Sequence, residues 1–333
     1  MQKAKKLKNK YIAALILKSI LCLLFCTIVV ISFGKVFGEE NNVVGVVTVI
    51  SLLNFRFSNL DFKVRQAALT IVGIFGVLSI SPYIASISNP FLGFIINFIS
   101  IIGILILTCH NVRLCNHSIL VLSYFLLYGY KVENTEILIN RIIGLIFGGI
   151  LVASIFYIKQ RKIEFKNTFI DIINDVDFNT ERTKWQLKFA FVTTSAIMIG
   201  EFLHIPRAMW IGIACMSVFH PDKSQLQIRY KQRMLYMVLG CLMYMSIYFL
   251  IPQQFRGLIG LIGGVMIGFS GTYKWQTVFN AFGALSAATP ILGFGGAIIF
   301  RILNNVFGAL YSKGFDYIIN FIDNKEFANV NEA

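Results

Sequence analysis

Continuous apolar runs, separated by short polar segments, fill most of the chain from Tyr11 onward. The runs are rich in Leu, Ile, Phe and Gly and lack the apolar–polar alternation of a transmembrane β-barrel. They predict helices at residues 12–35, 43–54, 67–86, 91–108, 114–130 and 136–158, followed by 185–203, 207–219, 233–251, 255–271, 275–290 and 295–320. The pattern therefore predicts an all-α integral membrane protein with about 12 transmembrane helices.

The second helix in each group of six is short. Residues 43–54 and 207–219 provide about a dozen positions each, whereas a helix that crosses a bilayer needs roughly 20. Pro206 and Pro221 bound the later segment. A short, proline-bounded apolar segment is typical of the discontinuous helices that form transport sites. The alternative is a tilted or re-entrant helix that only fills the bundle.

Three elements occur in the same order in both halves of the chain. They are a glycine that follows the short helix and a basic loop (Gly73 and Gly240), an arginine seven residues before a glycine (Arg141–Gly148 and Arg301–Gly308), and a lysine near the start of the first helix (Lys18 and Lys188). This shared order predicts two homologous six-helix repeats. Because six crossings return the chain to the same side, the repeats would be parallel.

The repeats define the predicted domain boundaries. Residues 1–158 form the first six-helix repeat and residues 185–322 the second. Between them, residues 159–184 are polar with an apolar helical stripe, which predicts a cytoplasmic amphipathic linker. Residues 323–333 form a polar C-terminal tail. The first apolar run extends to Phe37 without a small-residue cleavage site, so we expect an uncleaved first helix.

Composition supports a membrane protein and gives its orientation. Of the 333 residues, 56% are hydrophobic and only 14% are charged, which excludes an ordinary soluble globule. Basic residues concentrate before Tyr11, at 56–65, at 159–188 and at 223–233. The positive-inside rule places these segments in the cytoplasm, and with them both termini of a multi-pass cell-membrane protein. The same rule explains the net charge of +14 without nucleic acid.

Basic residues inside the predicted helices are the candidates for a binding site. Placing a charge at bilayer depth costs about 2.5–3.5 kcal/mol on insertion scales, so we expect such a residue to have a structural or functional role. Arg141, Arg301 and Arg233 could attract an anion, because guanidinium offers forked donors to a carboxylate. Lys18 and Lys188 are further candidates. The alternative for all five is a side chain that reaches out to the lipid headgroups.

Two other features admit a structural and a functional interpretation. Trp210 could belong to the aromatic belt at the membrane interface, or it could stack against an aromatic substrate. Gly260, Gly264 and Gly268 recur every four residues, which indicates a helix-packing seam. No catalytic arrangement, phosphate-binding loop or standard metal-ligand spacing occurs, so we predict no enzyme activity, metal or cofactor.

The chain resembles the fusaric acid resistance-like family of integral membrane transporters, which includes aromatic acid exporters. In that family a short helix bearing Trp ends in Pro, a basic loop follows, and an Arg precedes a Gly by seven residues. Pro206, Trp210, Pro221, Arg233 and Gly240 carry this pattern here. The resemblance covers residues 183–323 well and the first half more loosely.

In the first half the resemblance has one clear departure, because Gln66 stands in the place of the arginine. The second half would therefore carry more of the substrate contact. We also expect no segment of this sequence to form the large soluble domain that many family members carry.

The resemblance implies efflux of small organic anions, with aromatic carboxylic acids as a candidate class. Two alternatives stay open: an anion channel on the same scaffold, and a membrane scaffold protein that transports nothing. The expected partners are a small organic anion and the lipid bilayer, with no nucleic acid. Association into a homo-oligomer is also left open.

Overall fold

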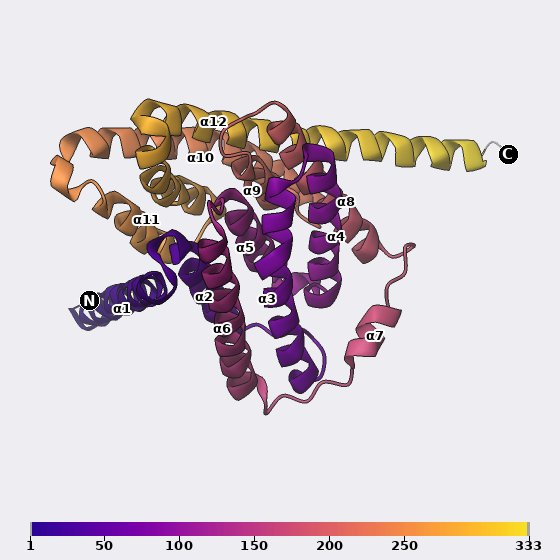
Figure 1. The fold of residues 1–333 in the computed structure, drawn as a ribbon, viewed down its shortest axis with the longest axis horizontal. Coiled ribbons are helices and arrows are strands. Elements are labelled where there is room, and N and C mark those ends of the chain that lie inside the picture. Colours follow the sequence, from indigo (N-terminus) through magenta and orange to yellow (C-terminus); the bar gives the residue numbers. More distant parts are fainter. Residues whose placement is uncertain (1, 332–333) are drawn as a thin grey trace.

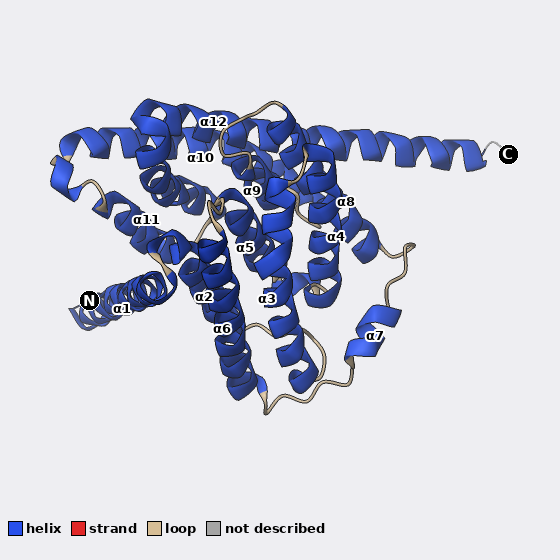
Figure 2. Ribbon diagram, in the orientation of Figure 1, coloured by secondary structure: helices blue, strands red, loops and turns tan. Residues whose placement is uncertain are grey.

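The computed structural model describes the backbone of residues 2–331, with side chains at 14–222 and 224–321, and its regular structure is entirely helical (Figure 2). The first half contains α1 (Gln2–Phe37), α2 (Asn42–Phe55), α3 (Val64–Ile87), α4 (Pro90–Thr108), α5 (His117–Gly129) and α6 (Thr135–Gln160). Then follow α7 (Phe169–Asn174), α8 (Glu181–Phe202), α9 (Met209–Val218), α10 (Lys223–Leu250), α11 (Leu258–Phe269) and α12 (Tyr273–Asn331). Each predicted segment overlaps one of these helices.

Some predicted boundaries are wrong. Helix α10 begins at Lys223, ten residues before its predicted start, because Asp222 caps it through a hydrogen bond from the backbone N–H of Ser224. The polar run predicted as a loop is thus an extension of the helix. The two predicted helices at 275–290 and 295–320 form one long element, α12, with a break at Gly293 (φ 70°). Helix α12 also continues through the predicted tail to Asn331 (Figure 1).

Six helices of the described chain are long and apolar enough to cross a membrane: α1 from Ala14, α3, α4, α6, α10 from Ser224, and α12 as far as Phe321. The chain is therefore an all-helical membrane protein. The total of 12 crossings and the two parallel repeats remain predictions. Helix α2 has 14 residues and α9 has 10, and at 1.5 Å per residue neither spans a hydrocarbon core about 30 Å thick.

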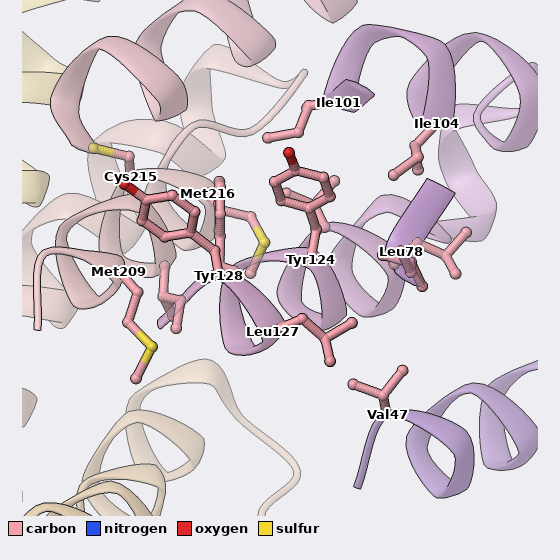
Figure 3. Close-up of a cluster of buried hydrophobic side chains, with 14 of the residues drawn as sticks. Val47, Leu78, Ile101, Ile104, Tyr124, Leu127, Tyr128, Met209, Cys215 and Met216 are labelled. Carbon is pink, nitrogen blue, oxygen red and sulfur yellow. The ribbon is translucent and has the colours of Figure 1, made fainter. Parts of the chain in front are cut away.

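Helix α5 lies in the centre of the bundle. Figure 3 shows its Tyr124 with Met216 of α9 on one side and Ile101 of α4 and Leu78 of α3 on the other, while Tyr128 lies beyond Met216. Tyr124 is completely buried, and its hydroxyl donates to Asn97 Oδ1 at 2.8 Å. Because α5 contacts α2, α3, α4 and α9, it joins the two halves into one hydrophobic core.

In each half, the fourth helix contacts the first helix of the other half. Helix α4, the fourth of the first half, packs against α8, the first of the second half. Helix α11, the fourth of the second half, packs against α1, the first of the first half (Figure 1). Such an exchange is what two parallel repeats around a common axis would produce, so it supports the predicted repeat.

The linker at residues 159–184 contains the short helix α7 at the edge of the bundle (Figure 1). A capping box between Thr168 and Asp171 starts this helix. The backbone N–H of Phe169 donates to Gln66 Oε1 at 2.8 Å, and Arg182 pairs with Asp175 at 2.9 Å. Hydrogen bonds thus hold the linker against α3 and the start of α8.

Candidate functional site

The two short helices position the candidate site because both begin inside the protein. Helix α2 follows Asn41, which is completely buried, and α9 follows Ala208, which is 2% exposed. The first backbone N–H groups of a helix have no partner within it and carry a partial positive charge. Each short helix therefore directs positive potential into the interior of its own half.

Arg141 of α6 lies at the start of α2. Its side chain is 3% exposed, and its Nε donates to Asn41 Oδ1 at 3.0 Å. Its Nη1 donates to the backbone carbonyl of Tyr130, while its buried Nη2 has no partner among the described residues. All the partners of Arg141 are neutral groups.

Arg301 of α12 lies at the start of α9. It is 2% exposed, and its guanidinium carbon is 4.8 Å from the centre of the Trp210 ring. The buried Nε finds no hydrogen-bond partner within the described chain. Trp210 is itself 3% exposed, so its ring is enclosed by the protein. The indole forms a cation–π contact with a buried guanidinium.

Arg233 of α10 lies beside Arg301. It is 2% exposed, and both its Nε and its Nη2 donate to Asn305 Oδ1, at 3.0 and 2.7 Å. The amide of Asn305 in turn donates to the backbone carbonyl of Arg301 at 2.7 Å. We call Arg233, Arg301, Asn305 and Trp210 the arginine centre. Arg233 lies in the third turn of its helix, so the prediction that it begins the helix is wrong.

No carboxylate neutralises these guanidinium groups in the described part of the chain. The buried charged side chains there are Arg141, Arg233 and Arg301, and no aspartate or glutamate is among them. The ion pairs formed by described residues lie in the α4–α5 loop and around α7 and the start of α8. The three arginines are turned into the protein, so they do not extend to lipid headgroups. A buried cation without a counter-charge favours an anionic ligand.

Glycines bring the arginine-bearing helices onto the short helices. A Cβ at Gly308 would lie 2.5 Å from the carbonyl oxygen of Ile211 in α9, and one at Gly148 would overlap the Thr48 hydroxyl in α2. A Cβ at Gly240 would lie 2.6 Å from the carbonyl of Val278. Gly148 thus contacts α2 in the first half, and Gly308 contacts α9 in the second half. Gly73 differs, because it has open space around it.

The other predicted residues are less buried than the arginine centre or contribute through the backbone. Lys18 is exposed on α1, and Lys188 is half-buried on α8. Pro221 is exposed in the turn before α10. The carbonyl of Pro206 accepts a hydrogen bond at 2.9 Å from Asn304 of α12, which fixes the start of α9.

Sequence reasoning missed three asparagines that hold this arrangement, namely Asn41, Asn304 and Asn305. Asn41 and Asn305 each accept hydrogen bonds from an arginine, and Asn304 binds the carbonyls that precede α9. The adjacent Asn304 and Asn305 in an apolar helix were the available signal, because amides at bilayer depth usually bond to another helix.

Comparison with known proteins gives one family match. Residues 195–312 match the family model described as fusaric acid resistance protein-like. The matched segment contains α9, α10, α11 and the part of α12 with Arg301 and Asn305. It confirms the resemblance found in the second half and indicates a membrane transporter or resistance protein. No curated protein and no solved structure matches the chain.

Proposed function

From the match of residues 195–312 to fusaric acid resistance-like proteins, we propose that the chain is a transporter that exports small organic anions across the cell membrane. One observation carries the proposal. Arg233 and Arg301 are buried side by side and share the Asn305 amide as a partner, and no carboxylate of the described residues pairs with either of them. An anionic solute would supply the missing negative charge.

The chemistry of the arginine centre favours a carboxylate. A guanidinium is planar and presents donors in a fixed fork that matches the two oxygens of a carboxylate. The Nε of Arg301 has no partner in the described chain, so it retains a donor for such a ligand. Trp210 adds an aromatic surface next to the charge, which favours an acid that carries a ring.

The first half supplies a second, weaker cationic position at Arg141. There Asn41 and the carbonyl of Tyr130 satisfy most of the guanidinium, and only Nη2 remains without a partner. Gln66, which stands in the place of Arg233, accepts a hydrogen bond from the linker. In the proposed transporter the second half binds the anion, and Arg141 contributes to the electrostatic path. Outward transport with both termini in the cytoplasm belongs to the same proposal.

The test is transport of labelled benzoate by purified protein in liposomes, with and without a pH gradient. We expect uptake and efflux in the wild type and at least a tenfold loss in Arg233→Gln, because a hydrogen bond to a charged group contributes about 1.5–3 kcal/mol. The matched control is Arg256→Gln, which removes an arginine that lies over Tyr248 outside the arginine centre.

The outcomes distinguish the proposed carrier from its rivals. Benzoate currents far above the turnover of a carrier would indicate an anion channel on the same scaffold. No transport of any carboxylate under either condition would contradict both and leave a membrane scaffold. An equal loss of benzoate transport in Arg233→Gln and Arg256→Gln would show that the arginine centre has no specific role in transport.

A further inference from the structure

A large apolar cavity lies between α1, α2 and α11, at the edge of the bundle where the two halves meet. Its volume is about 770 Å³, within the range of about 300–1,000 Å³ usual for ligand pockets. Its walls are mostly aliphatic, with contributions from Leu23 and Val30 of α1, Val49 of α2 and Val265 of α11. Such a lining takes a hydrocarbon chain.

The glycines of α11 widen this cavity. The spacing of Gly260, Gly264 and Gly268 predicted a helix-packing seam, and these glycines lie between α11 and two neighbours, α1 and α12. A Cβ at Gly264 would lie 3.6 Å from Leu23, and one at Gly268 would lie 3.8 Å from the Ser19 hydroxyl, so both positions leave room. Gly260 also lines the cavity, and a Cβ there would lie 3.1 Å from the Cβ of Ser286 in α12. All three glycines therefore form part of the cavity wall.

One charged residue, Lys18, is present in the lining of the cavity. It lies seven residues, or about 10 Å of helix rise, from Tyr11, where the apolar run of α1 begins. A lysine at this depth reaches the headgroup level with its flexible side chain. The cavity thus joins an apolar interior to a cation at the membrane surface.

This cavity is separate from the arginine centre. None of the three buried arginines and no residue of α9, α10 or α12 lines it. An anion on its way through the arginine centre therefore has no reason to occupy it. The exposed apolar residues of α1, such as Leu21 and Leu24, place the cavity next to the acyl chains of the bilayer.

We propose that the cavity binds an anionic phospholipid, with one acyl chain between α1, α2 and α11 and the phosphate at Lys18. The bound lipid fills the space that α1 and α11 leave open and thereby joins the first helix of one half to the fourth helix of the other. Charge complementarity at Lys18 selects an anionic headgroup over a zwitterionic one. The site does not depend on the proposed transport function.

Photo-crosslinking tests the proposal directly. The purified full chain is incubated with phosphatidylglycerol that carries a diazirine in one acyl chain, and crosslinked peptides are mapped by mass spectrometry. We expect crosslinks to the stretches of α1 and α11 that line the cavity. Lys18→Gln should lower their yield about fivefold, as expected when one basic residue near an anionic surface is lost. The control Lys35→Gln removes a lysine at the other end of α1 and should not lower it.

A second variant tests whether the crosslinks arise in the cavity, and competing ligands test whether the headgroup is recognised. Gly264→Leu should fill the cavity and abolish the crosslinks in a protein that still elutes as a single folded species. Unlabelled phosphatidylglycerol should compete. Equal competition by phosphatidylcholine would overturn the proposal, because the headgroup would then not be recognised. Competition by benzoate or laurate alone would overturn it in favour of a transported acid, and crosslinks elsewhere would overturn it altogether.

Discussion

Asn305 accepts two hydrogen bonds from Arg233 through one oxygen, with Oδ1 3.0 Å from Nε and 2.7 Å from Nη2. An amide oxygen satisfies these donors without cancelling the positive charge. An aspartate of nearly the same shape would accept the same bonds and neutralise the guanidinium. The identity of this one side chain therefore decides whether Arg233 keeps its charge for a ligand.

Asn305→Asp should abolish carboxylate transport in a protein that still folds. The new carboxylate would pair with Arg233 and also oppose an incoming anion, so we expect benzoate efflux from liposomes to fall at least tenfold. Melting in detergent should show only a modest loss of stability, about 1 kcal/mol. The carboxylate keeps both hydrogen bonds to Arg233 but loses the one that the Asn305 amide donates to the carbonyl of Arg301.

The control for this variant is Asn89→Asp. Asn89 caps α4 by accepting a hydrogen bond from the backbone N–H of Leu92, and aspartate serves equally well at this position. The charge change is the same but lies away from the arginine centre. Full transport by Asn305→Asp would show that the charge of Arg233 is not used.

Arg301→Lys should weaken carboxylate binding although it keeps the charge. Lysine lacks the planar face that lies over Trp210 and the forked donors that match a carboxylate. We expect the KM for benzoate to rise about tenfold, the equivalent of one hydrogen bond to a charged group. Arg256→Lys is the matched control. The guanidinium carbon of Arg256 lies 4.2 Å from the centre of the Tyr248 ring, and the residue is partly exposed. Similar KM values in the two variants would contradict a specific role for Arg301.

The hydrophobic pattern predicted where the helices lie, because each apolar run must become a helix in a membrane. It could not predict that α10 starts at Lys223, since that depends on a polar cap and on an amphipathic turn that resembles a loop. The sequence pattern identified Arg141, Arg233 and Arg301, because a charged residue in an apolar run is energetically costly. It did not identify Asn41 and Asn305, because each contacts its arginine only through a tertiary contact more than 70 residues away along the chain.

The sequence also could not separate bound arginines from lipid anchors. Both interpretations place a basic residue near the end of an apolar run, and only burial decides between them. Arg141 and Lys18 occupy similar positions in the sequence pattern, yet the first is 3% exposed and the second is exposed. Arg141 donates to Asn41 and to the carbonyl of Tyr130 inside the protein, whereas Lys18 lies beside the cavity.

His220, in the turn between α9 and α10, should titrate below its ordinary pKa of 6.5. Burial, and secondly the charge of Arg229, lowers the pKa of the imidazole. Its Nδ1 accepts a hydrogen bond at 3.1 Å from the backbone N–H of Asp222, which requires the unprotonated ring. The stability that this group contributes is complete above pH 6.5 and is lost as the pH falls from 6.5 toward the folded-state pKa.

The measurement is a ¹³C NMR titration of histidine-labelled protein, in which His220→Gln identifies the resonance. Below pH 6.5 the wild type should also lose hydrogen-exchange protection at the start of α10, whereas His220→Gln should show no such dependence. A midpoint at or above 6.5 for the assigned resonance would contradict the packing of this turn.

Gly308→Ala should separate α12 from α9 and disturb the arginine centre. The added Cβ would lie 2.5 Å from the carbonyl oxygen of Ile211, a backbone atom that cannot rotate away. Overpacking of this kind costs about 1–3 kcal/mol, so we expect a lower melting temperature in detergent and weaker benzoate transport. Gly314→Ala, on the same helix with open space around it, should instead be neutral or stabilising by up to about 1 kcal/mol. Gly148→Ala should fall between them, because its added Cβ meets the Thr48 side chain, which can rotate. Equal melting temperatures for the Gly308 and Gly314 variants would show that α12 does not depend on this contact.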